Sequence, residues 1–169
     1  AINGNAVIVY NNMGTAQKLQ GKYEEAENSF QSAINRQKDY IDAYVNQANL
    51  FIETEKINEA ESIINTAMKI DMSNLALNLA LGNLRLKQEH HKEAIGIYEN
   101  ILNAQPQNTD AIINLGQIYE HLGDTEKALK YYHDALNIIP GYDQSIIGIA
   151  SILEKQGKYE EALAVVNPA

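Results

Sequence analysis

The sequence predicts an all-α fold in which antiparallel helix pairs stack along the chain as an α-solenoid. The first observation is a strict period, because a small residue returns every 34 positions at Ala26, Ala60, Ala94, Ala128 and Ala162. A second small-residue series has the same period and consists of Gly14, Ala48, Gly82, Gly116 and Ala150. The third observation is that apolar residues within each period follow helical spacing. A constant period of this length is typical of a repeat protein, in which each unit packs mainly on its neighbours.

The period divides the chain into a lead-in, four complete units and a truncated fifth unit, which together form one continuous solenoid domain. The expected boundaries are 1–6 for the lead-in and 7–40, 41–74, 75–108, 109–142 and 143–169 for the units. In the first unit, Tyr10 and Gly14 fit one helix, whereas Ala26 and Phe30 fit the next. Each unit is therefore expected to be a helical hairpin.

Turn residues separate the two helices of each unit and end the second helix. Five equivalent positions mark the turn between the helices: Gly21, Glu55, Glu89, Gly123 and Gly157. Glycine suits a left-handed residue at a helix C-terminus, and two of these positions carry glutamate instead. Pro106 and Pro140 mark the ends of the second helices, because proline cannot continue a helix.

The residues at fixed places in each unit resemble the tetratricopeptide repeat family. In the fourth unit the family pattern is present as Ile112, Leu115, Gly116, Tyr119, Ala128, Tyr132, Ala135 and Pro140, with a departure only at the first large position. The first unit departs further, because Gln17 stands at the aromatic position and Lys38 stands at the proline position. The resemblance covers nearly the whole chain and implies a right-handed superhelix of helix pairs.

Composition and charge exclude several classes of protein. The formal net charge is −9, which disfavours binding to nucleic acid or to an anionic membrane surface. The longest apolar stretch, 75–84, is too short to cross a bilayer, which takes about 20 residues. There is no cysteine, so neither disulfides nor thiolate metal sites contribute. A cytoplasmic protein is expected.

The sequence contains no recognisable catalytic or metal-binding motif. None of the histidines, His90, His91, His121 and His133, pairs with another at metal-ligand spacing on one helical face. Gly21-Lys22 and Gly157-Lys158 resemble fragments of a phosphate-binding loop, but the rest of that motif is missing. Near the fourth turn, Asp124 is expected to cap the following helix. We therefore expect no catalytic residue, no metal and no cofactor.

The family resemblance implies that the first helix of each unit lines a concave, partner-binding groove. The residues expected to line this groove are Asn12, Val45, Asn46, Asn49, Leu79, Asn83, Leu86, Ile113, Asn114, Gln117 and Ile147. Carboxamides can hydrogen-bond to the backbone of a bound peptide, and aliphatic residues can hold its side chains. The asparagines can also serve to stabilise neighbouring helices. Leu79, Leu86 and Ile113 are expected to form the apolar floor.

Acidic residues along the same wall favour a basic or amphipathic ligand. They are Asp42, Glu53, Asp110, Glu120 and Glu154. The leading hypothesis is a non-enzymatic scaffold or adaptor that binds a peptide or helix of another protein. Two alternatives stay open: the substrate-recognition array of a larger enzyme, such as an O-linked glycosyltransferase, and a secretion or assembly chaperone. Leu163 and Val166, near the end of the chain, also make a second copy of the chain a candidate partner.

Overall fold

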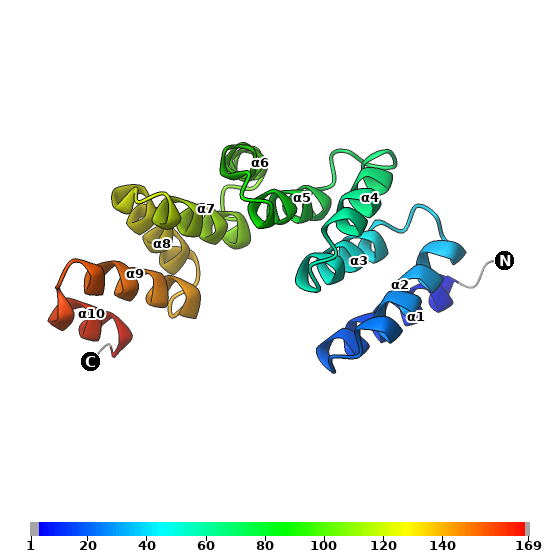
Figure 1. Ribbon diagram of the computed structural model, residues 1–169, viewed down its shortest axis with the longest axis horizontal. Coiled ribbons are helices and arrows are strands. Elements are labelled where there is room, and N and C mark those ends of the chain that lie inside the picture. Colours follow the sequence, from blue (N-terminus) through cyan, green and yellow to red (C-terminus); the bar gives the residue numbers. More distant parts are fainter. Residues whose placement is uncertain (1–3, 168–169) are drawn as a thin grey trace. The chain divides into compact units, whose positions relative to one another are not determined.

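The computed structural model describes residues 4–167, and side chains from residue 6 onward. This part of the chain contains ten α-helices and no β-strand (Figure 1). The helices are α1 (Gly4–Leu19), α2 (Tyr23–Arg36), α3 (Ile41–Glu53), α4 (Ile57–Met68), α5 (Leu75–Lys87), α6 (His91–Ala104), α7 (Thr109–His121), α8 (Thr125–Ile138), α9 (Asp143–Lys155) and α10 (Tyr159–Val166). The predicted all-α fold of helix pairs is confirmed. None of the described helices combines the length and the apolar character that a membrane span needs.

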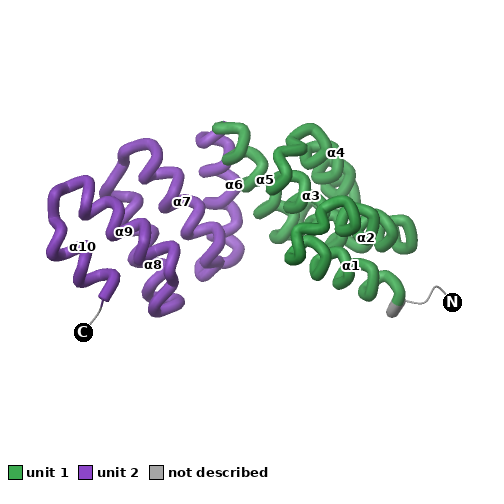
Figure 2. Tube along the Cα trace, turned by 60° about the horizontal axis from the view of Figure 1, so that its bottom comes forward, with its two compact units in different colours: residues 1–89 green, residues 90–169 purple. Residues whose placement is uncertain are grey.

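The chain forms two compact units, which Figure 2 shows in different colours. Each compact unit is larger than one 34-residue repeat, and from here on unit 1 and unit 2 mean these two parts of the chain. Unit 1 comprises residues 1–89 and unit 2 comprises residues 90–169. In unit 1, α1 packs on α2 and α3 packs on α4, while α5 contacts both α3 and α4. In unit 2, α7 packs on α8 and α9 packs on α10, while α6 contacts α7. The repeat boundaries and the single continuous solenoid remain predictions.

The turns between paired helices have the left-handed conformation that the sequence predicts. Gly21, Gly123 and Gly157 have φ values of 74°, 76° and 76°. Glu55 and Glu89, which replace glycine at the equivalent positions, both have φ of 60°. The two glutamates therefore adopt the same turn as the glycines, although the left-handed region costs a residue with a Cβ about 1–2 kcal/mol.

Replacing Glu89 by glycine should raise the free energy of unfolding by about 1 kcal/mol, because glycine adopts this turn without the Cβ clash. The greater freedom of glycine in the unfolded chain offsets part of the gain. Gly123→Ala is the matched control: nothing lies within 4 Å of an added Cβ there, so only the backbone conformation opposes it. Urea unfolding should shift in opposite directions for the two variants, and a lower midpoint for Glu89→Gly would contradict the expectation.

Small residues allow the paired helices to approach closely. Ala26, Ala60, Ala94 and Ala128 are completely buried. A Cβ added at Gly14 would lie 2.6 Å from the Phe30 ring, closer than real Cβ contacts come. The 34-residue series therefore marks the contact between helices, as the sequence indicates.

Asp124 starts α8 as predicted. Its side-chain carboxylate accepts a hydrogen bond from the backbone N–H of Lys127 at 3.2 Å. Asn74 and Asn108 cap α5 and α7 in the same way, by accepting from Leu77 and Ala111. Each cap satisfies a backbone donor that the helix itself leaves without a partner.

Candidate functional site

The first helices of unit 1 present a stripe of amide side chains. Helices α1, α3 and α5 are neighbours, because α3 contacts both of the others. Asn12 is exposed, whereas Asn46, Asn49 and Asn83 are half-buried. Asn46 and Asn49 share one face of α3, since residues three apart in a helix are neighbours on its surface. We call these four residues the amide face.

Two leucines lie next to the amide face on α5. Leu79 and Leu86 are seven residues apart, and Asn83 lies between them at helical spacing. Both leucines are half-buried, so part of each side chain is accessible. Helix α5 therefore presents amide and aliphatic groups together on one side.

The aliphatic residues that are expected along the groove differ in how accessible their side chains are. Val45 and Ile113 have 9% and 2% of their surface exposed and belong to the hydrophobic cores of units 1 and 2. Ile147 is 66% exposed. The expectation that Val45 and Ile113 present side chains to a ligand is therefore corrected, because neighbouring helices cover them.

In unit 2 the corresponding first helices are α7 and α9, which contact each other. Asn114 is half-buried and Gln117 is exposed on α7, and Ile147 is exposed on α9. This side of unit 2 has the same mixture of amide and aliphatic groups as the amide face of unit 1.

One member of the amide face also links two helices. The Asn46 side-chain amide donates to the side-chain oxygen of Asn11 at 2.9 Å. Asn11 is buried on α1, and its backbone carbonyl accepts from the hydroxyl of Thr15. The alternative interpretation of these asparagines, as groups that stabilise neighbouring helices, therefore applies to Asn46. No sequence pattern marks Asn11 as its partner.

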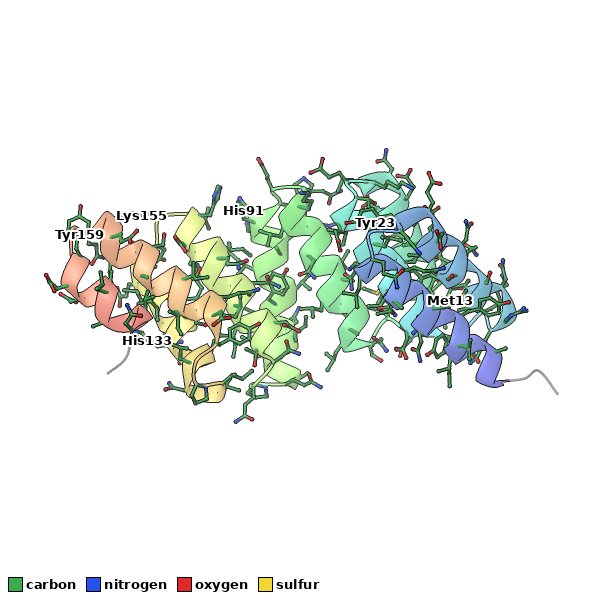
Figure 3. All side chains as sticks on the ribbon, turned by 90° about the horizontal axis from the view of Figure 1, so that it is seen from below. Met13, Tyr23, His91, His133, Lys155 and Tyr159 are labelled. Carbon is green, nitrogen blue, oxygen red and sulfur yellow. The ribbon has the colours of Figure 1, made fainter. Side chains whose placement is uncertain are left out.

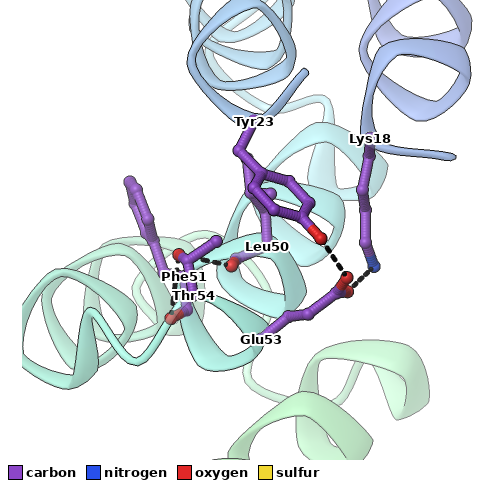
Figure 4. Close-up of polar contacts among 6 residues, drawn as sticks. All are labelled: Lys18, Tyr23, Leu50, Phe51, Glu53 and Thr54. Carbon is purple, nitrogen blue, oxygen red and sulfur yellow. Dashed lines mark hydrogen bonds and ion pairs between the residues drawn. The ribbon is translucent and has the colours of Figure 1, made fainter. Parts of the chain in front are cut away.

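Two acidic residues expected to attract a basic ligand are already paired with lysine. Glu53 lies 2.7 Å from the Lys18 ammonium group and accepts from the Tyr23 hydroxyl at 3.5 Å (Figure 4). In unit 2, Glu120 lies 2.9 Å from the ammonium group of Lys155, which Figure 3 labels. The two pairs occupy the same positions of the repeat with the charges exchanged. Glu53 and Glu120 are thus tied to neighbouring first helices.

Glu120 accepts three hydrogen bonds in unit 2. The donors are the Tyr132 hydroxyl at 2.9 Å, the Ser151 hydroxyl at 3.0 Å and the Lys155 ammonium group at 2.9 Å. Burial alone would raise the pKa of Glu120, but the hydrogen bonds from Lys155, Tyr132 and Ser151 outweigh it and lower the pKa. The carboxylate therefore joins α7, α8 and α9 as a structural group.

The structure brings together two histidines that the sequence keeps 30 positions apart. The rings of His91, at the start of α6, and His121, at the end of α7, have centroids 4.9 Å apart. Spacing along one helix could not reveal this contact, because the two residues lie on different helices. Within the described residues, no group of three or more His, Asp or Glu side chains is arranged to hold a metal ion.

Apolar side chains are exposed on α10. Leu163 and Val166 are exposed, as is Tyr159 at the start of the same helix (Figure 3). At the position of Val166, earlier repeats carry Phe30, Ile64 and other residues that are completely buried. Contact of this face with a second copy of the chain stays a prediction.

Comparisons with known proteins agree with the observed helix pairs. A family model described as tetratricopeptide repeat matches residues 19–84. A model described as anaphase-promoting complex, cyclosome, subunit 3, matches residues 87–169. No catalytic family model matches the chain. The search of curated proteins finds no match.

Solved structures show the same fold at low sequence identity. A thermophilic tetratricopeptide repeat protein from Thermus thermophilus is 18% identical with a TM-score of 0.83, covering 95% of this chain and 88% of that one. For pilF of Pseudomonas aeruginosa the identity is 19%, the TM-score 0.82 and the coverage 95% and 73%. YrrB, described as having an unusual peptide-binding site, is 21% identical with a TM-score of 0.62 and coverage of 96% and 84%.

Proposed function

Because the chain belongs to the tetratricopeptide repeat family, we propose that it is a non-catalytic scaffold that binds a peptide or helix of a partner protein along its first helices. Membership of this family implies protein–protein interaction. The observation that supports a binding role for these helices is the amide face of unit 1 with Leu79 and Leu86 beside it. Asn46 also links α3 to α1, so the groups that support a binding role are the exposed Asn12 and the half-buried Asn49, Asn83, Leu79 and Leu86.

The chemistry of the amide face suits an extended or helical peptide. Carboxamide groups both donate and accept hydrogen bonds, so they can match the backbone of a peptide whatever its sequence. Leu79 and Leu86 add apolar surface, and its burial against a ligand favours binding. Asn114, Gln117 and Ile147 offer the same combination in unit 2.

The ligand proposed for this surface is basic or amphipathic. The net charge of −9 favours cationic partners by long-range attraction. Since Glu53 and Glu120 are paired with lysines, Asp42, Asp110 and Glu154 are the wall carboxylates that contribute to this attraction. All three are exposed. A cytoplasmic location stays a prediction.

Partner capture followed by a peptide-binding measurement tests the proposal. Protein partners of the wild type would be identified by pull-down and mass spectrometry, and the contacting segment would be synthesised as a labelled peptide. Asn49→Ala combined with Leu79→Asp should weaken its binding at least about tenfold, because a charge replaces an apolar contact. Asn49 is replaced in place of Asn46 because this variant keeps the hydrogen bond between Asn46 and Asn11, which joins two helices.

The matched control changes the surface of a second helix. Glu59→Ala combined with Asn65→Ala alters two exposed residues of α4 and should leave the affinity unchanged. Circular dichroism would verify that both variants fold. Equal affinities of the wild type and the Leu79 variant would overturn the proposal. A captured partner that is chemically modified by a linked catalytic domain would replace it with the transferase alternative.

A further inference from the structure

A cavity of about 810 Å³ opens between two connections of unit 2. One connection joins α6 to α7 and contributes Pro106 and Asn108, and the first turn of α7 adds Asp110. The other joins α8 to α9 and contributes Ile139 and Tyr142. The volume is within the range of about 300–1,000 Å³ that is usual for ligand pockets. The cavity lies at the loops, and the residues of the amide face do not line it.

Ile139, on the apolar side of this cavity, departs from the repeat. In the three earlier repeats its position carries Gln37, Asp71 and Gln105, whereas the position of Tyr142 carries Tyr40, Asn74 and Asn108. The fold thus accepts polar residues at both places. Ile139 lies on a loop and is 42% exposed. Packing in the core therefore does not explain why this position is apolar. Ile139 thus gives the cavity an apolar wall opposite its polar residues, a combination that is usual in ligand pockets.

The charge of the cavity has one sign. Asp110 is the only residue with a formal charge among those that line it. Its carboxylate is exposed, and no ion pair or hydrogen bond to another described side chain is present for it. A second, smaller cavity of about 390 Å³ shares Pro106, but its lining contains both Lys130 and Asp134 and thus has no single sign.

We propose that the larger cavity receives an arginine side chain of a partner protein. The guanidinium group would pair with the Asp110 carboxylate and lie against the Tyr142 ring, while the aliphatic stem of the arginine would contact Ile139 and Pro106. Arginine fits better than lysine because its planar, weakly hydrated head stacks on aromatic rings and binds carboxylates through two hydrogen bonds. This inference does not depend on binding at the amide face.

The test compares two unstructured Gly/Ser peptides that differ at one central residue. One carries arginine and the other carries citrulline, which has nearly the same shape but no charge. Binding to the full chain would be followed by NMR, using the methyl signals of Ile139 at millimolar peptide concentrations. The arginine peptide should bind about tenfold more tightly, from the ion pair and the contact with the aromatic ring.

Three variants locate the binding. Asp110→Asn should reduce the difference between the two peptides to the part that the contact with the Tyr142 ring contributes. Ile139→Gln places the residue found one period earlier at an exposed position, so the variant should fold normally and bind both peptides more weakly. Its binding would be followed by the backbone amide signal of Asp110, because the Ile139 methyl signals are lost. Glu126→Gln, at an exposed carboxylate of α8 that does not line the cavity, should change nothing.

Two results would overturn the proposal. Equal affinities for the arginine and citrulline peptides would show that charge plays no part. Absence of any shift of the Ile139 signals, with the protein folded, would show that the cavity does not take this side chain. Neither result would bear on the amide face, whose test uses different residues and a different ligand.

Discussion

Replacing Tyr132 by alanine should lower the free energy of unfolding by about 3–5 kcal/mol, the range found when large buried aromatic residues are truncated. Only 1% of the Tyr132 surface is exposed. Its ring fills the space between Gly116 on α7 and Gly148 on α9, and its hydroxyl donates to Glu120. Truncation would thus leave a cavity between two neighbouring repeats and remove one of the donors to a partly buried carboxylate.

Tyr132→Phe separates the ring from the hydroxyl. This variant keeps the packing and loses one hydrogen bond to a charged group, for which about 1.5–3 kcal/mol is expected. Ser151 and Lys155 still donate to Glu120, so the lower end applies. Urea unfolding followed by circular dichroism would measure both variants, with the slope compared to check that the transition stays cooperative. If the two variants lost the same stability, packing of the ring would not be the main contribution of Tyr132.

The second large effect is expected at Gly148. A Cβ at this position would lie 2.4 Å from two atoms of the Tyr132 ring, far inside normal contact. The other edge of the ring already lies so close to Gly116 of α7 that a Cβ there would be 2.7 Å away, which leaves the ring little room to move in that direction. Gly148→Ala should therefore lower the free energy of unfolding by about 1–3 kcal/mol through overpacking. The higher helix propensity of alanine offsets up to about 1 kcal/mol of this loss.

Gly96→Ala is the control for helix propensity. Gly96 lies inside α6, and nothing comes within 4 Å of an added Cβ. The same substitution should therefore stabilise the protein by about 0.5–1 kcal/mol there. Opposite signs at the two glycines would show that the space beside Tyr132 decides the outcome. A stabilised Gly148→Ala variant would contradict the proposed packing.

Much of the fold could be predicted from the sequence, because the signals for it are local. The left-handed turn at Glu55 and Glu89 followed from their place in the 34-residue series, even though glutamate disfavours that conformation. The cap at Asp124 followed from its position before a helix. The role of Gly148 could not be predicted in this way, because the ring that it contacts belongs to another helix.

The candidate site could be predicted only in outline. The family resemblance placed Leu79, Asn83 and Leu86 along the groove, and helical spacing puts all three on one face of α5. Their contact with a ligand stays a prediction. Helical spacing could not distinguish Ile113 from Ile147, which occupy equivalent positions but are buried and exposed respectively. Their exposure depends on which residues of adjacent helices cover them.

The period, the helix pairs, the turn positions and the family of this protein follow from the order of its amino acids, because each of these depends on residues close together in the chain. Three-dimensional packing was needed to establish which equivalent residues are accessible, that Lys18 and Lys155 pair with acidic wall residues, and that Asp110 and Ile139 line one cavity. These contacts join residues about one period apart on different helices. Local patterns leave such distances open, and packing between helices fixes them.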